Sequence, residues 1–225
     1  MKPIVELKDL EFSYGGQEIL NGGNFAMNPG EFTFLVGKSG SGKSTLMKLI
    51  YFELMPSKGE ITVGEISSKS IKRKEVLHVR RKLGIIFQDF KLIRDRNVFE
   101  NLAFILEVTG HNPKAIKKRV HEVLSEVGLG HKWKSKPEEL SGGEIQRVGI
   151  ARAIISNPML ILADEPTGNL DPENSIEILE LLKRINAKGT AVLFATHNYE
   201  MIKRGDGKIV KMHGGKLEVF ERPKS

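Results

Sequence analysis

The sequence contains no cysteine, which excludes disulfide bonds and thiolate metal sites. No apolar run approaches the roughly 18 residues that a membrane-spanning helix needs. The first residues, Met1 to Glu6, lack the apolar segment of a secretory signal. Aromatic residues make up only 7% of the chain, with a single Trp. We therefore expect a protein that stays in the reducing cytoplasm.

The composition is that of a globular protein. Hydrophobic residues make up 40% and charged residues 28% of the 225 residues, which allows one large domain or two small ones with a sizeable core. The formal charge of +7 is concentrated in residues 61–120, whose 14 Lys and Arg exceed 6 Asp and Glu. Such a region is a solvated basic face, a face near anionic lipid, or a surface for nucleic acid. Aromatic side chains are not interleaved with these charges, so a base-stacking surface is not expected.

The most informative stretch is a glycine-rich run, GKSGSGKST, at residues 37–45. It follows an apolar segment, residues 31–36, that predicts a buried strand, and it precedes a helical stripe that predicts a helix over residues 44–55. In that setting, backbone N–H groups at a helix N-terminus converge on phosphates. We expect Lys43 to bind the β- and γ-phosphates, Ser44 to bind Mg²⁺ and Thr45 to contact the α-phosphate. The phosphate-binding residues are Gly37, Ser39, Gly40, Ser41, Gly42, Lys43, Ser44 and Thr45.

A second pair of candidate residues follows another apolar stretch. Residues 159–163 predict a strand that ends at Asp164 and Glu165. Carboxylates at the carboxyl edge of a sheet lie where open α/β folds bind ligands. Because neighbouring strand residues point to opposite sides, the two acids can take different roles. We expect Asp164 to hold Mg²⁺ and Glu165 to orient or deprotonate the attacking water.

The remaining patterns place strands and helices in alternation. Strands are predicted over residues 4–14, 60–66, 83–87 and 191–195, and helices over residues 98–127 (broken near 110–113), 145–155 and 175–185. This order indicates an α/β protein whose core sheet is largely parallel.

The stretch Leu140-Ser141-Gly142-Gly143-Glu144 lies 97 residues (141 minus 44) beyond Ser44. With the glycine-rich run, it identifies a resemblance to the nucleotide-binding domain of ATP-binding cassette (ABC) proteins over nearly the whole chain. The resemblance implies a P-loop fold with a RecA-like parallel-sheet core, an antiparallel β-subdomain and an α-helical arm. One domain, 1–225, is expected, with the β-subdomain at 1–30 plus 60–84, the core at 31–59 plus 141–225, and the arm at 89–140.

The resemblance also implies further site residues. Gln88 would belong to the metal and water site, His197 would hold the γ-phosphate and the attacking water in line, and Tyr14 would stack on adenine. Each chain of such a protein completes its site in a head-to-tail homodimer that forms with ATP. Ser141, Gly142 and Gly143 would cap the γ-phosphate bound to the other chain, and Asp171 would lie in the loop beside them.

Residues 86–103 are similar to the cell-division members of the family. That similarity implies an integral membrane protein as partner, a place on the cytoplasmic face of the inner membrane, and control of cell-wall hydrolysis. The alternatives are the ATPase of a lipoprotein-release or efflux transporter, and a soluble ATPase acting on nucleic acid or ribosomes. No specific nucleic acid is expected as a partner. The departures from the family pattern are Gly22-Gly23, Tyr51-Phe52-Glu53, Asn97 and Asn198.

Overall fold

The computed structural model describes residues 2–220. Two sheets and seven α-helices make up these residues, with two short 3₁₀ turns at Gly130–Lys132 and Pro137–Glu139. Within the same part of the chain, no helix is both long enough and apolar enough to cross a membrane.

The larger sheet has six strands in the order β10-β9-β3-β8-β7-β6. All neighbours are parallel except β10, which runs antiparallel to β9. Its strands are β3 (Phe32–Val36), β6 (Leu83–Ile86), β7 (Leu160–Asp164), β8 (Ala191–Thr196), β9 (Lys208–His213) and β10 (Lys216–Phe220). The central strands β3, β7 and β8 are mostly apolar and buried along nearly their whole length, because both faces of this sheet are covered.

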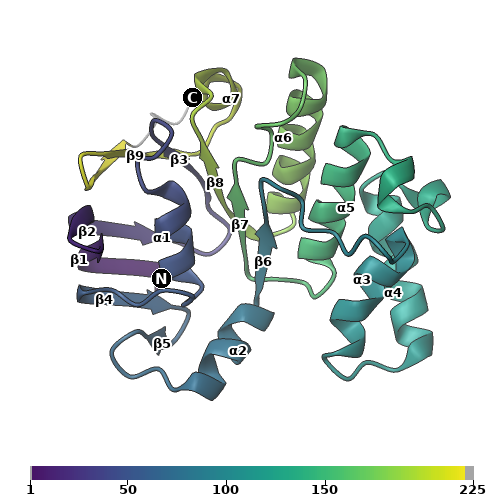
Figure 1. The fold of residues 1–225 in the computed structure, drawn as a ribbon, viewed down its shortest axis with the longest axis horizontal. Coiled ribbons are helices and arrows are strands. Elements are labelled where there is room, and N and C mark those ends of the chain that lie inside the picture. The colour runs from purple at the N-terminus through teal and green to yellow at the C-terminus, as the bar shows by residue number, and fades with distance from the viewer. Residues whose placement is uncertain (1, 221–225) are drawn as a thin grey trace.

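The smaller sheet is antiparallel, in the order β2-β1-β4-β5. Its strands are β1 (Val5–Tyr14), β2 (Gln17–Met27), β4 (Lys58–Val63) and β5 (Ile66–Ser67). Helix α1 (Lys43–Ile50) lies between the two sheets (Figure 1). Its buried Leu46, Leu49 and Ile50 join one core with residues from both sheets.

Four further helices cover the other face and flank of the large sheet. A second core joins α3 (Val98–Glu107), α4 (Pro113–Glu126), α5 (Gly142–Ile154) and α6 (Pro172–Asn186) to the strands that carry Phe34, Ile161 and Phe194. Helices α3 and α4 lie at the side of the molecule away from the small sheet (Figure 1). The short helix α7 (Tyr199–Arg204) follows β8, and α2 (Arg73–Arg81) precedes β6.

The expected helix over residues 44–55 is wrong at its end, because α1 stops at Ile50. Phe52 adopts a left-handed φ of 55°. The N–H groups of Glu53 and Leu54 both donate to the carbonyl of Lys48. Arg80 of α2 donates to the carbonyls of Tyr51 and Phe52, at 3.0 Å each. The chain therefore leaves the helix one turn earlier than its apolar spacing indicated.

The unusual residues of the sequence have local structural explanations. A side chain at Gly23 would lie 3.2 Å from Leu217 of the C-terminal hairpin, so the glycine allows that hairpin to pack on β2. Asn97 accepts a hydrogen bond from the N–H of Glu100 and caps α3. Asn198 accepts one from the N–H of Glu200 and caps α7. Asn is as good an N-cap as Asp and slightly better than Thr, so both positions keep the capping function.

Candidate functional site

The glycine-rich run joins β3 to α1 at the carboxyl edge of the large sheet. Gly40 and Gly42 adopt positive φ values of 75° and 102°, a conformation that favours glycine. A side chain at Gly42 would lie 2.5 Å from Met212 and 2.6 Å from Ile19. The loop therefore curls tightly against its surroundings and leaves the first N–H groups of α1 facing outward, an arrangement suited to an anion.

A cavity of about 230 Å³ lies over this loop. The residues that line it are Ile19, Ser39, Gly40, Ser41, Gly42, Lys43, Ser44, Thr45, Gln88, Glu165 and His197. Gln88, Glu165 and His197 come from three other places in the sequence, after β6, β7 and β8. The structure thus brings the expected catalytic residues and all the expected phosphate-binding residues except Gly37 to one space.

Glu165 is the centre of this cavity's polar contacts. It is 8% exposed and has a left-handed φ of 46°. Its Oε1 lies 3.2 Å from Nζ of Lys43 and 2.9 Å from Nδ1 of His197. Lys43 also donates to the carbonyls of Gly37, at 2.9 Å, and Lys38, at 3.2 Å. The lysine ammonium is therefore held over the loop by three oxygen atoms.

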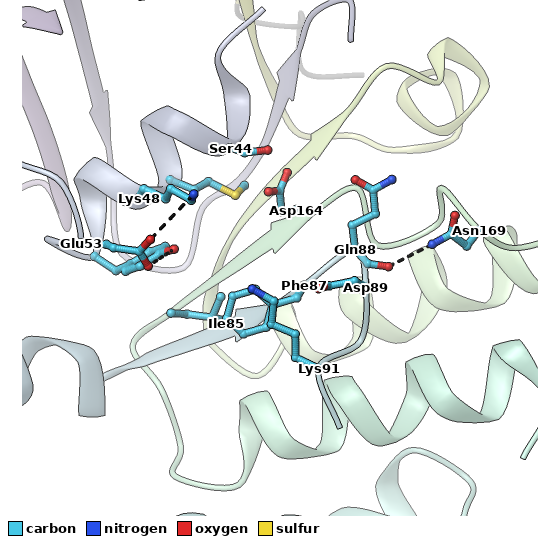
Figure 2. A pocket seen from close by; sticks show the side chains of 12 residues that line it. Ser44, Lys48, Glu53, Ile85, Phe87, Gln88, Asp89, Lys91, Asp164 and Asn169 are labelled. Atoms are coloured by element: carbon cyan, nitrogen blue, oxygen red, sulfur yellow. Dashed lines mark hydrogen bonds and ion pairs between the residues drawn. The ribbon is translucent and has the colours of Figure 1, made fainter. Parts of the chain in front are cut away.

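A second, larger cavity of about 430 Å³ begins beside Ser44 and Asp164. In Figure 2, Gln88 and Asp164 lie near Ser44. Lys48 of α1 and Glu53, just after α1, line one side of the cavity, and Asn169 lies on the opposite side. The sequence analysis assigned no role to Lys48 or Glu53. The signal for Glu53 was the departure from the family pattern at residues 51–53, where Tyr51 donates a hydrogen bond to Glu53 at 2.9 Å.

The residues at this junction fit a magnesium ion. Oδ1 of Asp164 is buried and has no hydrogen-bond partner among the described residues, so it is available to a cation. The pKa of the Asp164 carboxyl is raised, because the effect of burial outweighs the hydrogen bond with the Ser44 side chain, which lowers it. A hydroxyl, a carboxylate and an amide oxygen are ligands that Mg²⁺ accepts beside phosphate oxygens. Ser44, Gln88 and Asp164 supply these three groups.

The start of the stretch at residues 140–144, called the signature from here on (Ser141, Gly142 and Gly143), lies away from the cavity over the phosphate loop. Ser141 caps α5 by accepting a hydrogen bond from the N–H of Glu144 at 3.3 Å. Gly142 and Gly143 form the first turn, and a side chain at Gly143 would lie 2.4 Å from Oδ1 of Asn174. Asp171 caps α6 by accepting from the N–H of Asn174 at 2.9 Å, and this hydrogen bond lowers the pKa of its carboxyl. The signature and the loop at Asp171 are therefore neighbours on one surface.

Tyr14 is outside both cavities. Its ring is 44% exposed and meets Phe12 edge-on, with the centroids 4.9 Å apart. Tyr14 is the last residue of β1. The turn after it leads into β2, which carries Ile19 of the phosphate cavity. An exposed ring at this place is free to receive a planar group.

Comparisons with known proteins identify the family of this chain. The family model "ABC transporter" matches residues 20–168. The cell division ATP-binding protein FtsE of Bacillus subtilis is 49% identical over 213 residues, which cover 94% of this chain and 93% of that protein. FtsE of Streptococcus pneumoniae is 46% identical over 215 residues, 95% of this chain and 94% of that protein.

A solved structure resembles the fold over nearly its whole length. It is the dimeric post-hydrolysis state of an ATP-binding cassette bound to ADP and Pi, with a TM-score of 0.84 and 34% identity. The match covers 95% of this chain and 96% of that one. The chain described here belongs to the ABC transporter family, and it is an ATPase.

Proposed function

We propose that this ABC family member is the ATP-hydrolysing subunit of a membrane-coupled complex that acts in cell division. The observation that carries the enzymatic part is the cavity in which the phosphate loop, Gln88, Glu165 and His197 meet. The division role rests on the similarity to FtsE proteins over more than nine tenths of the chain. The proposed partner is an FtsX-like integral membrane protein.

The phosphate loop and α1 bind the substrate. The N–H groups of residues 39–45 surround the β- and γ-phosphates, and the dipole of α1 adds positive potential. Lys43 exchanges its contact with Glu165 for the phosphate oxygens, because the triphosphate carries several negative charges and Glu165 carries only one. Thr45 contacts the α-phosphate, and Tyr14 stacks on the adenine ring.

Ser44, Asp164 and Gln88 would hold magnesium. When bound, the ion neutralises charge on the β- and γ-phosphates and orients them for in-line attack. Asp164 carries the only carboxylate among these three residues, and it lies half-buried at the end of β7. The phosphate loop follows β3, and only β8 separates β3 from β7 in the large sheet. The sheet therefore fixes the position of Asp164 relative to the phosphate loop.

Glu165 and His197 act on the attacking water. Once Lys43 leaves for the phosphates, the carboxylate of Glu165 accepts the proton of a water molecule aligned with the γ-phosphate. His197 remains within hydrogen-bond distance of Glu165. It orients the carboxylate and contacts the γ-phosphate from the side of β8. Gln88 aligns the same water from the opposite side.

The site is completed by a second copy of the chain. Ser141 and Gly142 are exposed at the start of α5, with Gly143 buried behind them, and the helix N-terminus there favours an anion. In a head-to-tail dimer they cap the γ-phosphate bound to the partner, and Asp171 lies beside them at the interface. Hydrolysis removes this shared ligand and lets the subunits separate.

The membrane partner docks on the arm side of the molecule. We assign the β-subdomain to residues 1–30 plus 60–84, the core to residues 31–59 plus 141–225, and the arm to residues 89–140. The cavity of Figure 2 opens between α1 and the segment that leads into the arm, so a partner helix there would touch Gln88 directly. The chain would then be a peripheral protein on the cytoplasmic face of the inner membrane, where the complex controls cell-wall hydrolysis.

Two other functions compete with this one. A lipoprotein-release or efflux transporter would use the same ATPase cycle with a different membrane protein. A soluble ATPase on nucleic acid or ribosomes would use the basic region instead. The DNA-binding affinity at physiological salt tests this last function directly, since specific binding typically has a Kd of about 10⁻⁸–10⁻¹¹ M.

The deciding experiment is affinity purification of tagged Glu165→Gln protein from solubilised membranes with ATP, followed by mass spectrometry. Recovery of an FtsX-like protein together with division factors supports the proposal. Recovery of a transport permease keeps the ATPase mechanism and replaces the biological role. Absence of any membrane protein contradicts both membrane functions.

A further inference from the structure

The segment that carries Gln88 has an unusual backbone. Gln88 is followed by Asp89, and then Phe90 and Lys91 adopt left-handed φ values of 58° and 47°. A left-handed conformation costs an L-residue about 1–2 kcal/mol, and two in succession are rare. The segment lies between β6 and α3 and belongs to neither. Contacts from elsewhere in the chain must therefore hold it in this shape.

Arg152 makes the principal contacts of this kind. It lies in α5, and its guanidinium donates to the carbonyl of Lys91 at 2.5 Å and to that of Phe90 at 2.8 Å. Burial lowers the pKa of this guanidinium, and the nearby Asp89 offsets only part of that effect. An arginine nevertheless stays charged in a protein. A planar fork with two parallel donors fits two successive carbonyls, whereas a lysine ammonium presents a single point. The residue therefore binds the two strained peptide groups together.

Two asparagines hold the ends of the same segment. Asn169 donates to the carbonyl of Gln88 at 3.1 Å, shown by the dashed line between these two residues in Figure 2. Asn101, 1% exposed, accepts from the N–H of Ile93 and donates to the carbonyls of residues 93, 96 and 97. The backbone from Gln88 to Asn97 is thus fixed by α5, by the loop after β7 and by α3.

We propose that Arg152 is the positioning residue of Gln88. Its two hydrogen bonds link the backbone beside Gln88 to α5, the helix that begins at the signature residues. The inference rests on the proposed role of Gln88 at the magnesium and water site. Ser141 and Gly142 begin α5, and Arg152 lies in its last turn. A rigid helix joins them, so a displacement of α5 when the signature engages the partner's nucleotide is passed to the backbone beside Gln88.

The chain offers a matched control for this role. Arg119 of α4 donates to the carbonyls of Ile154 and Ile155, at 3.0 Å each, at the C-terminal end of the same α5. It therefore makes the same forked contact with two successive carbonyls, but these carbonyls lie outside the segment that carries Gln88. Arg119→Lys shows how the loss of such a forked contact affects the protein in general. Arg152→Lys shows that general effect together with any specific effect on Gln88.

The experiment compares Arg152→Lys, Arg119→Lys and Gln88→Ala in the full-length protein. Calorimetry measures ATP affinity with excess EDTA and with Mg²⁺, in the Glu165→Gln background so that ATP is not consumed. For Arg152→Lys we expect the gain in ATP affinity that Mg²⁺ brings to fall by about 10–100-fold, as is usual when the support of a metal ligand is removed. Affinity in EDTA should stay unchanged, and hydrogen exchange at residues 87–92 should become faster. Arg119→Lys should change neither quantity.

The outcomes separate the inference from the function on which it rests. If Gln88→Ala leaves the Mg²⁺ effect unchanged, the proposed role of Gln88 fails. If Gln88→Ala removes the effect and Arg152→Lys matches Arg119→Lys, the inference alone is wrong. Should Arg152→Lys fail to fold, Arg152→Gln, which keeps an amide donor without the charged fork, replaces it, with the same loss of the Mg²⁺ effect expected. An Arg152→Gln protein with a normal Mg²⁺ effect would then contradict the inference.

Discussion

Nζ of Lys43 lies 3.2 Å from Oε1 of Glu165, and both side chains are nearly buried. The residue proposed to hold the phosphates and the residue proposed to activate water are thus in direct contact. Removal of one charge leaves the other without its partner in a place with little solvent. The two substitutions described next should therefore have different consequences.

Glu165→Gln should keep ATP binding and slow hydrolysis by about 10²–10⁴-fold, as expected for loss of a general base. The glutamine keeps the size of the side chain but accepts no proton, so an ATP-bound dimer should accumulate. Single-turnover kinetics and size-exclusion chromatography with ATP measure the two effects. Normal turnover by this variant would show that Glu165 is not the base.

Lys43→Ala should abolish detectable ATP binding, because the phosphates lose their main cationic contact. Isothermal titration calorimetry gives the affinity directly. Lys58→Ala, at an exposed ion pair with Glu11, removes the same charge elsewhere and should bind ATP normally. Equal affinity for Lys43→Ala and wild type would rule out the proposed phosphate contact.

Tyr14→Ala should weaken ATP binding without changing the rate at saturating ATP. Stacking of a base on an aromatic ring contributes about 1–3 kcal/mol, so KM should rise severalfold or more while kcat stays constant. Tyr14→Phe keeps the ring and serves as the control. A constant KM in the alanine variant would place adenine elsewhere.

Glu144 gives a pH-dependent prediction for the start of α5. The N–H of Ser141 donates to its carboxylate at 2.9 Å and Lys132 lies 3.1 Å away, and these contacts lower the pKa of Glu144. A lowered folded-state pKa means that the stabilisation is present above the unfolded-state value of about 4.5 and is lost as the pH falls through the folded-state value. Glu144→Gln should therefore lower Tm at pH 7, with a difference from wild type that shrinks in acid.

The control for this measurement is Glu138→Gln, at an exposed glutamate before the signature. It removes the same charge outside the capping box of α5. A Tm difference for Glu144→Gln that stays constant from pH 7 to pH 3 would contradict the proposed cause.

Asn101→Ala should destabilise the helical arm. Four hydrogen bonds of this buried side chain would be lost, and a buried polar group left without a partner costs about 1–3 kcal/mol. Urea unfolding measures the change in the free energy of unfolding. Asn112→Ala removes an exposed cap of α4 and should cost no more than about 2 kcal/mol. A smaller effect at Asn101 than at Asn112 would show that the loop does not depend on Asn101.

The sequence analysis succeeded where the relevant residues are neighbours in the chain. The phosphate loop between β3 and α1, the acids at the end of β7 and the apolar spacing of α4 are all local patterns. It missed β2, because the Asn-Gly-Gly run at residues 21–23 interrupts the alternation that a strand requires. It also missed α2, whose only buried residue is Val79. A single inward residue produces no helical stripe.

The sequence by itself therefore determined the chemistry of this protein: a phosphate loop, two acids after a strand and a signature before a helix. Only the tertiary structure decided that Lys43 contacts Glu165, that Arg152 and Asn169 hold the segment of Gln88, and that α1 ends at Ile50. The physical reason is distance along the chain. Arg152 binds carbonyls 61 and 62 residues away, and no local periodicity records a contact that forms only when β6 and α5 pack together.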